Sequence, residues 1–219
     1  MQEAVKRRYS SPRRQEQAAG NRRAILEAAH ELFTTRGYRE TSVTEIAQLA
    51  RVSVDTLYAA VGRKPELLLA VHDLVLGDMQ LGEASRPLGA DERQYVKAIL
   101  AAPTAAEKLH VYADALGRLL PRVAPLSNAL RDAGSSDPEC RRVASSIDER
   151  RAANMRRLAG DLRATGELRP DLADDEVADL LWSMNSPAFF GMLAERGWTG
   201  ERYARLVEDV WTRTLLGAT

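Results

Sequence analysis

Apolar residues recur every three or four positions through most of the chain, which is the spacing of one face of an α-helix. The clearest such stretch starts at Ser42, whose hydroxyl can accept a hydrogen bond from a free amide while the Glu45 carboxylate reaches back to the serine amide. This capping box predicts a helix that begins near Val43. Its apolar face is made of Val43, Ile46, Ala47 and Ala50.

A second short helix is predicted directly after the first. Ser53 is a suitable N-cap, and Asp55 lies in the first turn, where the helix dipole favours an acid. The helix would run from Val54 to about Ala60 and end at Gly62, which can adopt the left-handed conformation of a helix exit. Two capped helices joined by a short turn are typical of a helix-turn-helix, whose second helix enters the major groove of DNA.

Eight further helices are predicted from the same periodicity and from proline, glycine and capping residues. They cover residues 20–36, 65–79, 91–102, 104–120, 126–133, 138–164, 176–196 and 201–216. Pro121 and Pro125 are expected to interrupt the chain between two of these helices, and Pro187 is expected to kink the helix that Asp174 caps. The segment 82–90 has the composition of a loop, and no alternating run is long enough for a strand. An all-α fold of about ten helices follows.

The stretch 22–71 carries the spaced pattern R-R-A-I-L-E-A-A-x-E-L-F-x-x-R-G-Y-x-x-T-S-V-T-E-I-A-x-x-A-x-V-S-x-x-T-L-Y-x-x-V-G-R-K-P-E-L-L-x-A-V. This pattern resembles the DNA-binding domain of the TetR family. The resemblance implies an N-terminal helix-turn-helix domain of three helices and a larger helical domain that binds a ligand and forms a dimer. We therefore expect a flexible basic N-terminal arm over residues 1–19, a DNA-binding domain over 20–64, and a ligand-binding and dimerisation domain over 65–219.

The resemblance also implies which residues contact DNA. On the second helix of the pair these are Ser53, Val54, Asp55 and Tyr58. Thr44 and Lys64 match positions that usually hold phosphates, although capping alone is an alternative role for Thr44 and Ser53. The chain departs from the family at Ala59 and Ala60, where many relatives carry an aromatic residue and a histidine that touch the DNA backbone. Those two contacts are expected to be absent.

The formal net charge of +0 hides an uneven distribution of charge along the chain. Residues 1–64 hold twelve Lys or Arg against seven Asp or Glu, a balance of +5, and the remaining residues carry −5. A basic head on an acidic body favours contact with a polyanion at one end only, since phosphate neutralisation supplies the sequence-independent part of DNA affinity. The basic clusters within residues 1–19 form either a solvating tail or an arm that lies along DNA.

The sequence favours residence in the cytoplasm, in association with the nucleoid. No apolar run approaches the length of a membrane span, and the N-terminus lacks the apolar core of a signal peptide. The one cysteine, Cys140, excludes an intramolecular disulfide and a cysteine-rich metal site.

No catalytic residue, cofactor or metal ligand is predicted. The sequence holds neither a glycine-rich phosphate loop nor a nucleophile motif. The pairs Glu27/His30 and Glu107/His110 have the Glu-x-x-His spacing of di-iron bundles. Their glutamates, however, lie opposite the apolar stripes of their helices, so they would point away from a bundle interior. His72 has no partner pattern and is expected at the surface or between packed helices.

The last two predicted helices are the expected dimer interface. Their apolar stripes are Val177, Leu180, Leu181, Met184 and Ala188 in one helix and Tyr203, Leu206, Val207, Val210 and Trp211 in the other. These residues could instead fill the core of a single chain, and part of each stripe must do so. The family resemblance favours a four-helix bundle between two chains.

The middle helices supply more large side chains than their own packing explains, together with several uncharged polar groups. We expect a small apolar effector to contact Tyr95, Tyr112, Leu116, Asn128, Asn154, Met155, Trp182, Asn185 and Phe189. The leading hypothesis is a homodimeric repressor that binds a palindromic operator in double-stranded DNA and is released by that effector. The alternatives are the same fold acting through a protein partner, or a helical-bundle metalloenzyme.

Overall fold

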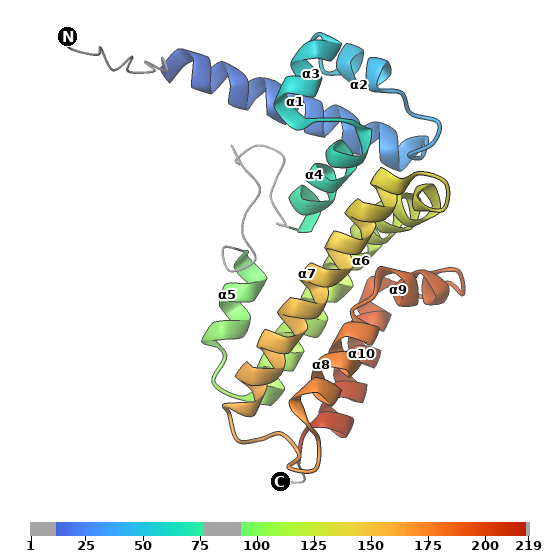
Figure 1. Cartoon of the computed structure of the whole chain (residues 1–219). Coiled ribbons are helices and arrows are strands. Elements are labelled where there is room, and N and C mark those ends of the chain that lie inside the picture. Colours follow the sequence, from blue (N-terminus) through green and yellow to red (C-terminus); the bar gives the residue numbers. More distant parts are fainter. Residues whose placement is uncertain (1–11, 77–92, 218–219) are drawn as a thin grey trace, which may run out of the picture.

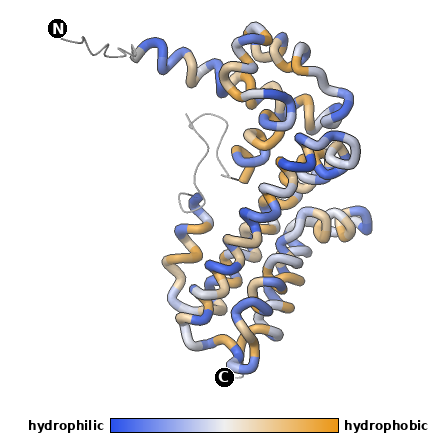
Figure 2. Tube along the Cα trace, in the orientation of Figure 1, coloured by the Kyte–Doolittle hydropathy of each residue, from blue (hydrophilic) through white to orange (hydrophobic). Residues whose placement is uncertain are grey.

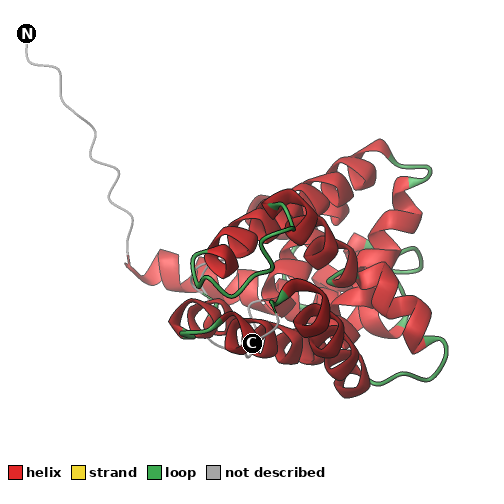
Figure 3. Ribbon diagram, turned by 90° about the horizontal axis from the view of Figure 1, so that it is seen from below, coloured by secondary structure: helices red, strands yellow, loops and turns green. Residues whose placement is uncertain are grey.

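The computed structural model describes residues 12–76 and 93–217, and these residues form ten α-helices and no strand (Figures 1 and 3). The helices are α1 (Pro12–Thr35), α2 (Val43–Leu49), α3 (Val54–Val61), α4 (Lys64–Leu76), α5 (Gln94–Ala101), α6 (Ala105–Gly134), α7 (Pro138–Arg163), α8 (Asp174–Met184), α9 (Pro187–Ala194) and α10 (Gly200–Leu215). An isolated antiparallel bridge joins Leu168 to Leu216. The prediction of an all-α fold is confirmed.

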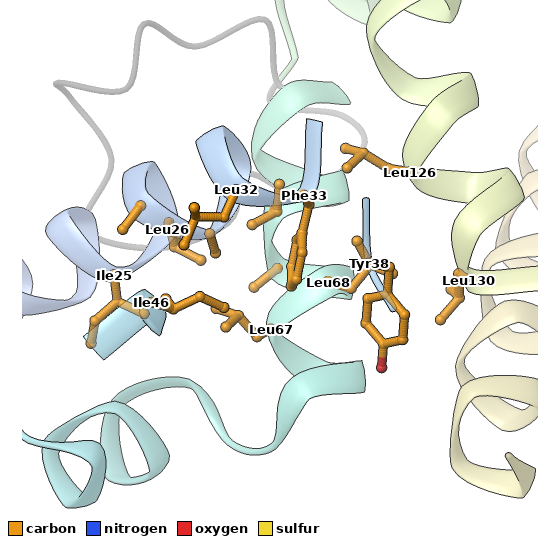
Figure 4. Packing of buried hydrophobic residues seen from close by; sticks show 14 of the residues in the cluster. Ile25, Leu26, Leu32, Phe33, Tyr38, Ile46, Leu67, Leu68, Leu126 and Leu130 are labelled. Atoms are coloured by element: carbon orange, nitrogen blue, oxygen red, sulfur yellow. The ribbon is translucent and has the colours of Figure 1, made fainter. Parts of the chain in front are cut away.

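The first four helices form the head of the molecule, in which α1 packs against α2, α3 and α4. Ile25, Ile46, Leu57 and Leu67 are inaccessible to solvent at its centre. Figure 4 shows that Leu126 and Leu130 of α6 approach the same core from the other side. The head therefore shares one continuous apolar cluster with the two long helices of the body.

Helix α6 is the central helix of the body. Helices α5, α7, α9 and α10 pack against it, and α8 packs against α7 (Figure 1). Their buried residues, among them Leu109, Leu162, Val177 and Trp211, form a second core. Hydrophilic and apolar positions alternate along α6 and α7, as they should in helices that bury one face and expose the other (Figure 2).

The closest approach of α6 and α10 is made by two glycines. A methyl group on Gly117 would lie 2.8 Å from the Gly200 carbonyl oxygen, and a methyl group on Gly200 would overlap the Gly117 carbonyl oxygen. Pro121 has no amide hydrogen, so the Gly117 carbonyl lacks its partner within α6. Only glycine leaves enough room for the two backbones at this crossing.

Helices α2 and α3 confirm the predicted helix-turn-helix. The Glu45 amide donates to Ser42 Oγ at 3.2 Å, and the Ser42 amide donates to the Glu45 carboxylate at 2.8 Å, which completes the capping box. The Thr56 amide donates to Ser53 Oγ at 3.1 Å. Gly62 follows α3 with a φ of 102°, in the region that favours glycine.

Helix α1 begins at Pro12, whereas the sequence predicted a start at Gly20. The part of the predicted flexible arm from Pro12 to Ala19 is therefore helical, and residues 1–11 lie outside the described residues. Low hydrophobicity suggested a lack of structure, but Arg, Gln, Glu and Ala are strong helix formers and proline suits the first turn. In Figure 1 this end of α1 projects beyond the other head helices.

The predicted interruption at Pro121 and Pro125 is wrong, because α6 continues through both prolines to Gly134. Each proline removes one backbone hydrogen bond. The neighbouring Leu120, Val123 and Leu126 are buried, and this packing holds the helix together across the missing bonds. The predicted loop 82–90, and the predicted helical residues 77–79 and 91–92, lie outside the described residues.

The predicted helix 176–196 is two helices, α8 and α9, so Pro187 starts a helix and does not kink one. Ser186 caps α9 by accepting from the Phe189 amide at 3.4 Å, and Pro187 then occupies the first turn. The predicted cap of α8 is also corrected by one residue. Ala173 is the N-cap, and its amide donates to the Glu176 carboxylate at 2.8 Å.

Candidate functional site

The helix-turn-helix buries one face of α3 and exposes the other. Leu57 is fully buried in the head core, whereas Tyr58 is 46% exposed. Ser53 and Asp55 are exposed at the start of α3, and Val54 is half-buried. The structure therefore brings the four predicted contact residues of this helix together at its start and along its accessible side.

The two predicted phosphate contacts come from helix starts on either side of α3. Thr44 is exposed in the first turn of α2, and Lys64 is the first residue of α4. Lys64 Nζ lies 4.2 Å from the centre of the Tyr38 ring and 3.5 Å from the Arg39 carbonyl oxygen. Burial lowers the pKa of Lys64, against opposing contributions from Cys140, Glu40 and Glu45. The ammonium group is thus anchored beside Tyr38 at the base of the head.

Arg22 is a residue that positions α3, and it was not predicted from the sequence. Its Nη1 donates to the Ala60 carbonyl at 2.7 Å, which ties α1 to the last turn of α3. A signal was present in the spacing, because Arg22, Ile25 and Ala29 follow one another at three- and four-residue intervals on one face of α1. Arg22 therefore supports the end of α3 at Ala60.

A polar network lies inside the body between α6, α7 and α8. Asn185 Nδ2 donates to the Tyr112 hydroxyl at 2.7 Å and lies 3.2 Å from Met155 Sδ. Arg151 Nε donates to Asn185 Oδ1 at 3.1 Å, and its Nη1 donates to the Asp148 carboxylate at 2.8 Å. Burial raises the pKa of Tyr112, so the phenol remains protonated and neutral.

Tyr112 is the middle ring of a stack of three aromatic side chains. Its centroid lies 6.4 Å from that of Tyr95, with 11° between the planes, and 5.5 Å from that of Trp211, with 13° between the planes. We call Tyr95, Tyr112 and Trp211 the aromatic stack. The cluster around it contains six of the predicted effector contacts: Tyr95, Tyr112, Leu116, Met155, Asn185 and Phe189.

The other three predicted effector contacts are not part of this cluster. Asn154 accepts a hydrogen bond from Arg157 on the exposed side of α7. Asn128 lies against Gly191 of α9. Trp182 is 37% exposed, lies under the Arg151 guanidinium and lines a surface cavity of about 220 Å³ together with Ala152, Arg156, Ala178 and Asp179.

Ion pairs join the head to α7: Arg63 with Glu139 at 3.9 Å, Glu66 with Arg142 at 3.2 Å, and Asp73 with Arg150 at 3.1 Å. The Arg150 guanidinium donates to both oxygens of Asp73, whose side chain is 12% exposed. Burial alone would raise the pKa of Asp73, but Arg150 and the neighbouring His72, 3.5 Å away, outweigh it and lower the pKa. Of these three ion pairs between head and body, the pair of Asp73 with Arg150 has the most buried carboxylate.

The cysteine and the buried histidine also lie at this joint. Cys140 is fully buried, and its sulfur lies 3.3 Å from the Tyr38 hydroxyl. Burial raises the pKa of the thiol, so Cys140 is a packing residue here and not a thiolate. His72 packs between helices beside Asp73, which is one of the two placements expected for it.

Within residues 12–76 and 93–217, no three His, Cys, Asp or Glu side chains come together in a way that could hold a metal ion. His110, one half of a Glu-x-x-His pair, instead contacts Glu208 of α10 at 2.8 Å on the surface. In the same parts of the chain, every helix is too short or too polar to cross a membrane.

Residues 25–71 match the family described as bacterial regulatory proteins of the tetR family. The match spans the C-terminal part of α1, the helix-turn-helix and the first turns of α4. These segments position α3 and its exposed face. Residues 25–71 therefore carry a DNA-binding domain of the tetR family. The chain thus has the DNA-binding domain of a transcriptional regulator, and the described residues of its body are helical. Among curated proteins, none is similar enough in sequence to match it.

Three solved structures share the fold of most of the chain. A transcriptional regulator from Saccharomonospora viridis in complex with choline has a TM-score of 0.67 at 19% identity, over 90% of this chain and 98% of that one. FadR from Bacillus subtilis in complex with stearoyl-CoA has a TM-score of 0.62 at 19% identity, over 85% and 95%. AibR in complex with isovaleryl coenzyme A and operator DNA has a TM-score of 0.56 at 21% identity, over 87% and 97%.

Proposed function

We propose that two copies of this TetR-family chain bind a palindromic operator, repress transcription from it, and are released by a small molecule. The observation that carries the proposal is the capped helix-turn-helix with the accessible side of α3, because a recognition helix needs free side chains to reach base edges. Two such heads would read half-sites about one helical turn, roughly 34 Å, apart on one face of the DNA.

The proposed DNA contacts are of two kinds. Val54 would suit the methyl group of thymine and Asp55 the amino group of cytosine, so these two side chains would set base preference. Thr44, Tyr58 and Lys64 would contact phosphates, which position the protein without reading sequence. Ser53 combines its cap of α3 with an exposed position at the start of the helix.

The proposed dimer uses the apolar residues of the last helices that their own core leaves partly accessible. The fully buried members of the predicted stripes fill the body of a single chain: Val177, Leu181, Tyr203, Val207 and Trp211. Leu180 on α8 and Leu206 and Val210 on α10 are half-buried and would complete their burial against a second chain. Dimerisation would place two heads on one operator.

Helix α4 is the proposed link between effector and DNA. It begins at Lys64 in the head, and its Asp73 pairs with Arg150 of α7. The next residue of α7, Arg151, belongs to the polar network in the body. An effector that displaces α7 would therefore displace α4 and change the separation of the two recognition helices. Release requires only that the effector binds the DNA-incompetent spacing more tightly.

The nature of the effector is proposed from the cluster around the aromatic stack. Its large rings and its few hydrogen-bonding groups are the usual lining of a small-molecule site. The relatives whose structures hold choline, stearoyl-CoA and isovaleryl coenzyme A support a small organic molecule as the ligand of this body.

The test is selection of genomic fragments by the purified protein, followed by footprinting and titration at several salt concentrations. We expect a symmetric protected site. Tyr58→Ala and Lys64→Ala should each weaken binding about tenfold for all sequences, and Lys64→Ala should reduce the salt slope by about one. Met192→Ala is the matched control, because Met192 is 59% exposed on α9, a helix of the body. Failure to find a symmetric site, or an equal loss in the control, would reject the proposal.

A further inference from the structure

Among the residues that the structure describes, two buried hydrogen-bond donors, one beside the aromatic stack and one within it, have no partner. They are Arg93 Nε, at the start of α5, and Trp211 Nε1, on α10. Trp211 is inaccessible to solvent, and Arg93 is only 7% exposed. An unsatisfied buried donor is costly, and most native proteins leave very few of them. Both orphan atoms are donors, so what they lack is an acceptor.

Arg93 is also a charge without a counter-charge. In the parts of the chain that the structure describes, no Asp or Glu pairs with its guanidinium, and its one polar contact is the Tyr95 hydroxyl, 3.4 Å from Nη1. Arg93 is the N-cap residue of α5 and does not cap the helix with its side chain. It therefore sits at the positive end of a helix dipole, where a cation is unfavourable and an anion is favoured.

The other buried cations of the body are compensated. Arg151 pairs with the Asp148 carboxylate at 2.8 Å and with the Asn185 side-chain oxygen. Lys108 Nζ donates to the Ile99 carbonyl at 2.9 Å, at the negative end of α5. Arg93 differs from both because its Nε has no acceptor and its charge lies at the positive end of a helix. A structural role would be expected to supply a partner from the protein, as it does for Lys108.

The surroundings of Arg93 indicate the chemistry of a molecule that could supply the missing acceptor. Tyr95 lies two residues further along α5 and is the outer ring of the aromatic stack, which continues through Tyr112 to Trp211. Tyr95 is half-buried, and its hydroxyl contacts the guanidinium, so its ring is the apolar surface of the stack nearest to Arg93. A molecule that suited both features would have an anionic end for Arg93 and the first amides of α5, and an apolar remainder for the rings.

We propose that Arg93, the amino end of α5 and the aromatic stack bind an organic acid through its carboxylate. The carboxylate would accept from Arg93 Nε and balance the guanidinium charge, and the hydrocarbon part would lie against Tyr95, the outer ring of the stack. This inference rests on the proposed function, since it names the chemical class of the effector. It replaces the small apolar effector expected from the sequence by a molecule with an apolar chain and one negative charge.

The test uses the full-length protein and straight-chain acids from butanoate to decanoate, each compared with its primary amide by titration calorimetry. The amide keeps the hydrocarbon and loses only the charge. We expect at least one acid to bind more than tenfold tighter than its amide. Arg93→Met should weaken the binding of that acid by about 10- to 100-fold and leave the amide unchanged. Lys97→Met, which removes an exposed cation from the same helix, should change neither.

A second measurement separates a binding role from a structural one. Without ligand, Arg93→Met removes an uncompensated buried charge, so it should raise the melting temperature; a structural arginine would lower it on removal. If Arg93→Met does not fold, Arg93→Gln is used for both measurements. Equal affinity for acid and amide, no binding of any acid, or a lowered melting temperature in the variant would overturn the proposal.

The two proposals fail in different ways. If the protein binds an acid through Arg93 but selects no operator, the carboxylate site is supported and the repressor function is rejected. If the protein protects a symmetric operator but binds no acid, the regulator function is supported and the carboxylate site is rejected.

Discussion

The head and the body of this regulator are stabilised in different ways. In the head, the capping contacts join residues close in sequence, such as Ser42 with Glu45 and Ser53 with Thr56. In the body, the decisive contacts join residues far apart, such as Asn185 with Tyr112 and Gly117 with Gly200. The difference teaches that a DNA-reading surface can be specified by a short local pattern, whereas an internal binding site needs several distant helices.

The two regions also treat polar groups differently. The head places its candidate contact residues on an accessible surface around an apolar core. The body encloses a phenol, an amide and two guanidinium groups among its aromatic rings. Enclosed polar groups need partners, so an unpartnered polar group in the body points to a bound ligand.

The largest expected effect is on the α6–α10 crossing. Gly200→Ala should lower the free energy of unfolding by about 2–3 kcal/mol, because the new methyl group overlaps the Gly117 carbonyl and the helices must separate. The measurement is the urea midpoint. Gly160→Ala is the control, since nothing lies within 4 Å of the added methyl group on α7, and it should stabilise by about 0.5–1 kcal/mol. Equal midpoints for the two variants would show that the crossing is not tightly packed.

An intermediate effect is expected at the joint between the two regions. Asp73→Asn should lower the free energy of unfolding by about 1–2 kcal/mol, because it weakens the two hydrogen bonds from Arg150. The effect stays in this range because the arginine is half-exposed and solvent screens its charge. Asp114→Asn, which alters the solvent-exposed pair with Arg118, is the control and should cost less than 0.5 kcal/mol.

The same pair gives the joint a pH dependence. The folded pKa of Asp73 is lowered relative to about 3.9 in an unfolded chain, so its contribution to stability is fully present above that value. The contribution is lost as pH falls through the lower, folded pKa. The difference in free energy of unfolding between the unmodified protein and Asp73→Asn should therefore shrink below about pH 4. A difference that stays constant from pH 6 to pH 3 would contradict this assignment.

The smallest effect is expected in the head. Ser42→Ala removes the acceptor for the Glu45 amide and half of the capping box, and it should cost about 1 kcal/mol. Ser145→Ala is the control, since Ser145 is exposed in the middle of α7 and alanine is the better helix former there. If both substitutions change the urea midpoint equally, local capping does not distinguish the head from the body.

The helix-turn-helix could be predicted because its signals are local. The Ser42 capping box, the Ser53 cap and Gly62 each act within one turn of the residue that carries the signal, and all three are present in the structure. The same holds for α7, whose Asp137 cap and Pro138 start were visible in the sequence. Six of the nine expected effector contacts gather around the aromatic stack, because large side chains at helical spacing have to be buried somewhere.

Other features depended on contacts that no local pattern contains. Helix α6 passes through Pro121 and Pro125 because packing on both sides of them replaces the lost backbone bonds, and α1 extends to Pro12 although no core requires it. Arg93 looked like any surface arginine in the sequence, since burial and the lack of a counter-charge are properties of its surroundings. Amino-acid order determined where helices start and which of their faces are apolar; the packing of distant helices decided which polar groups were left without a partner.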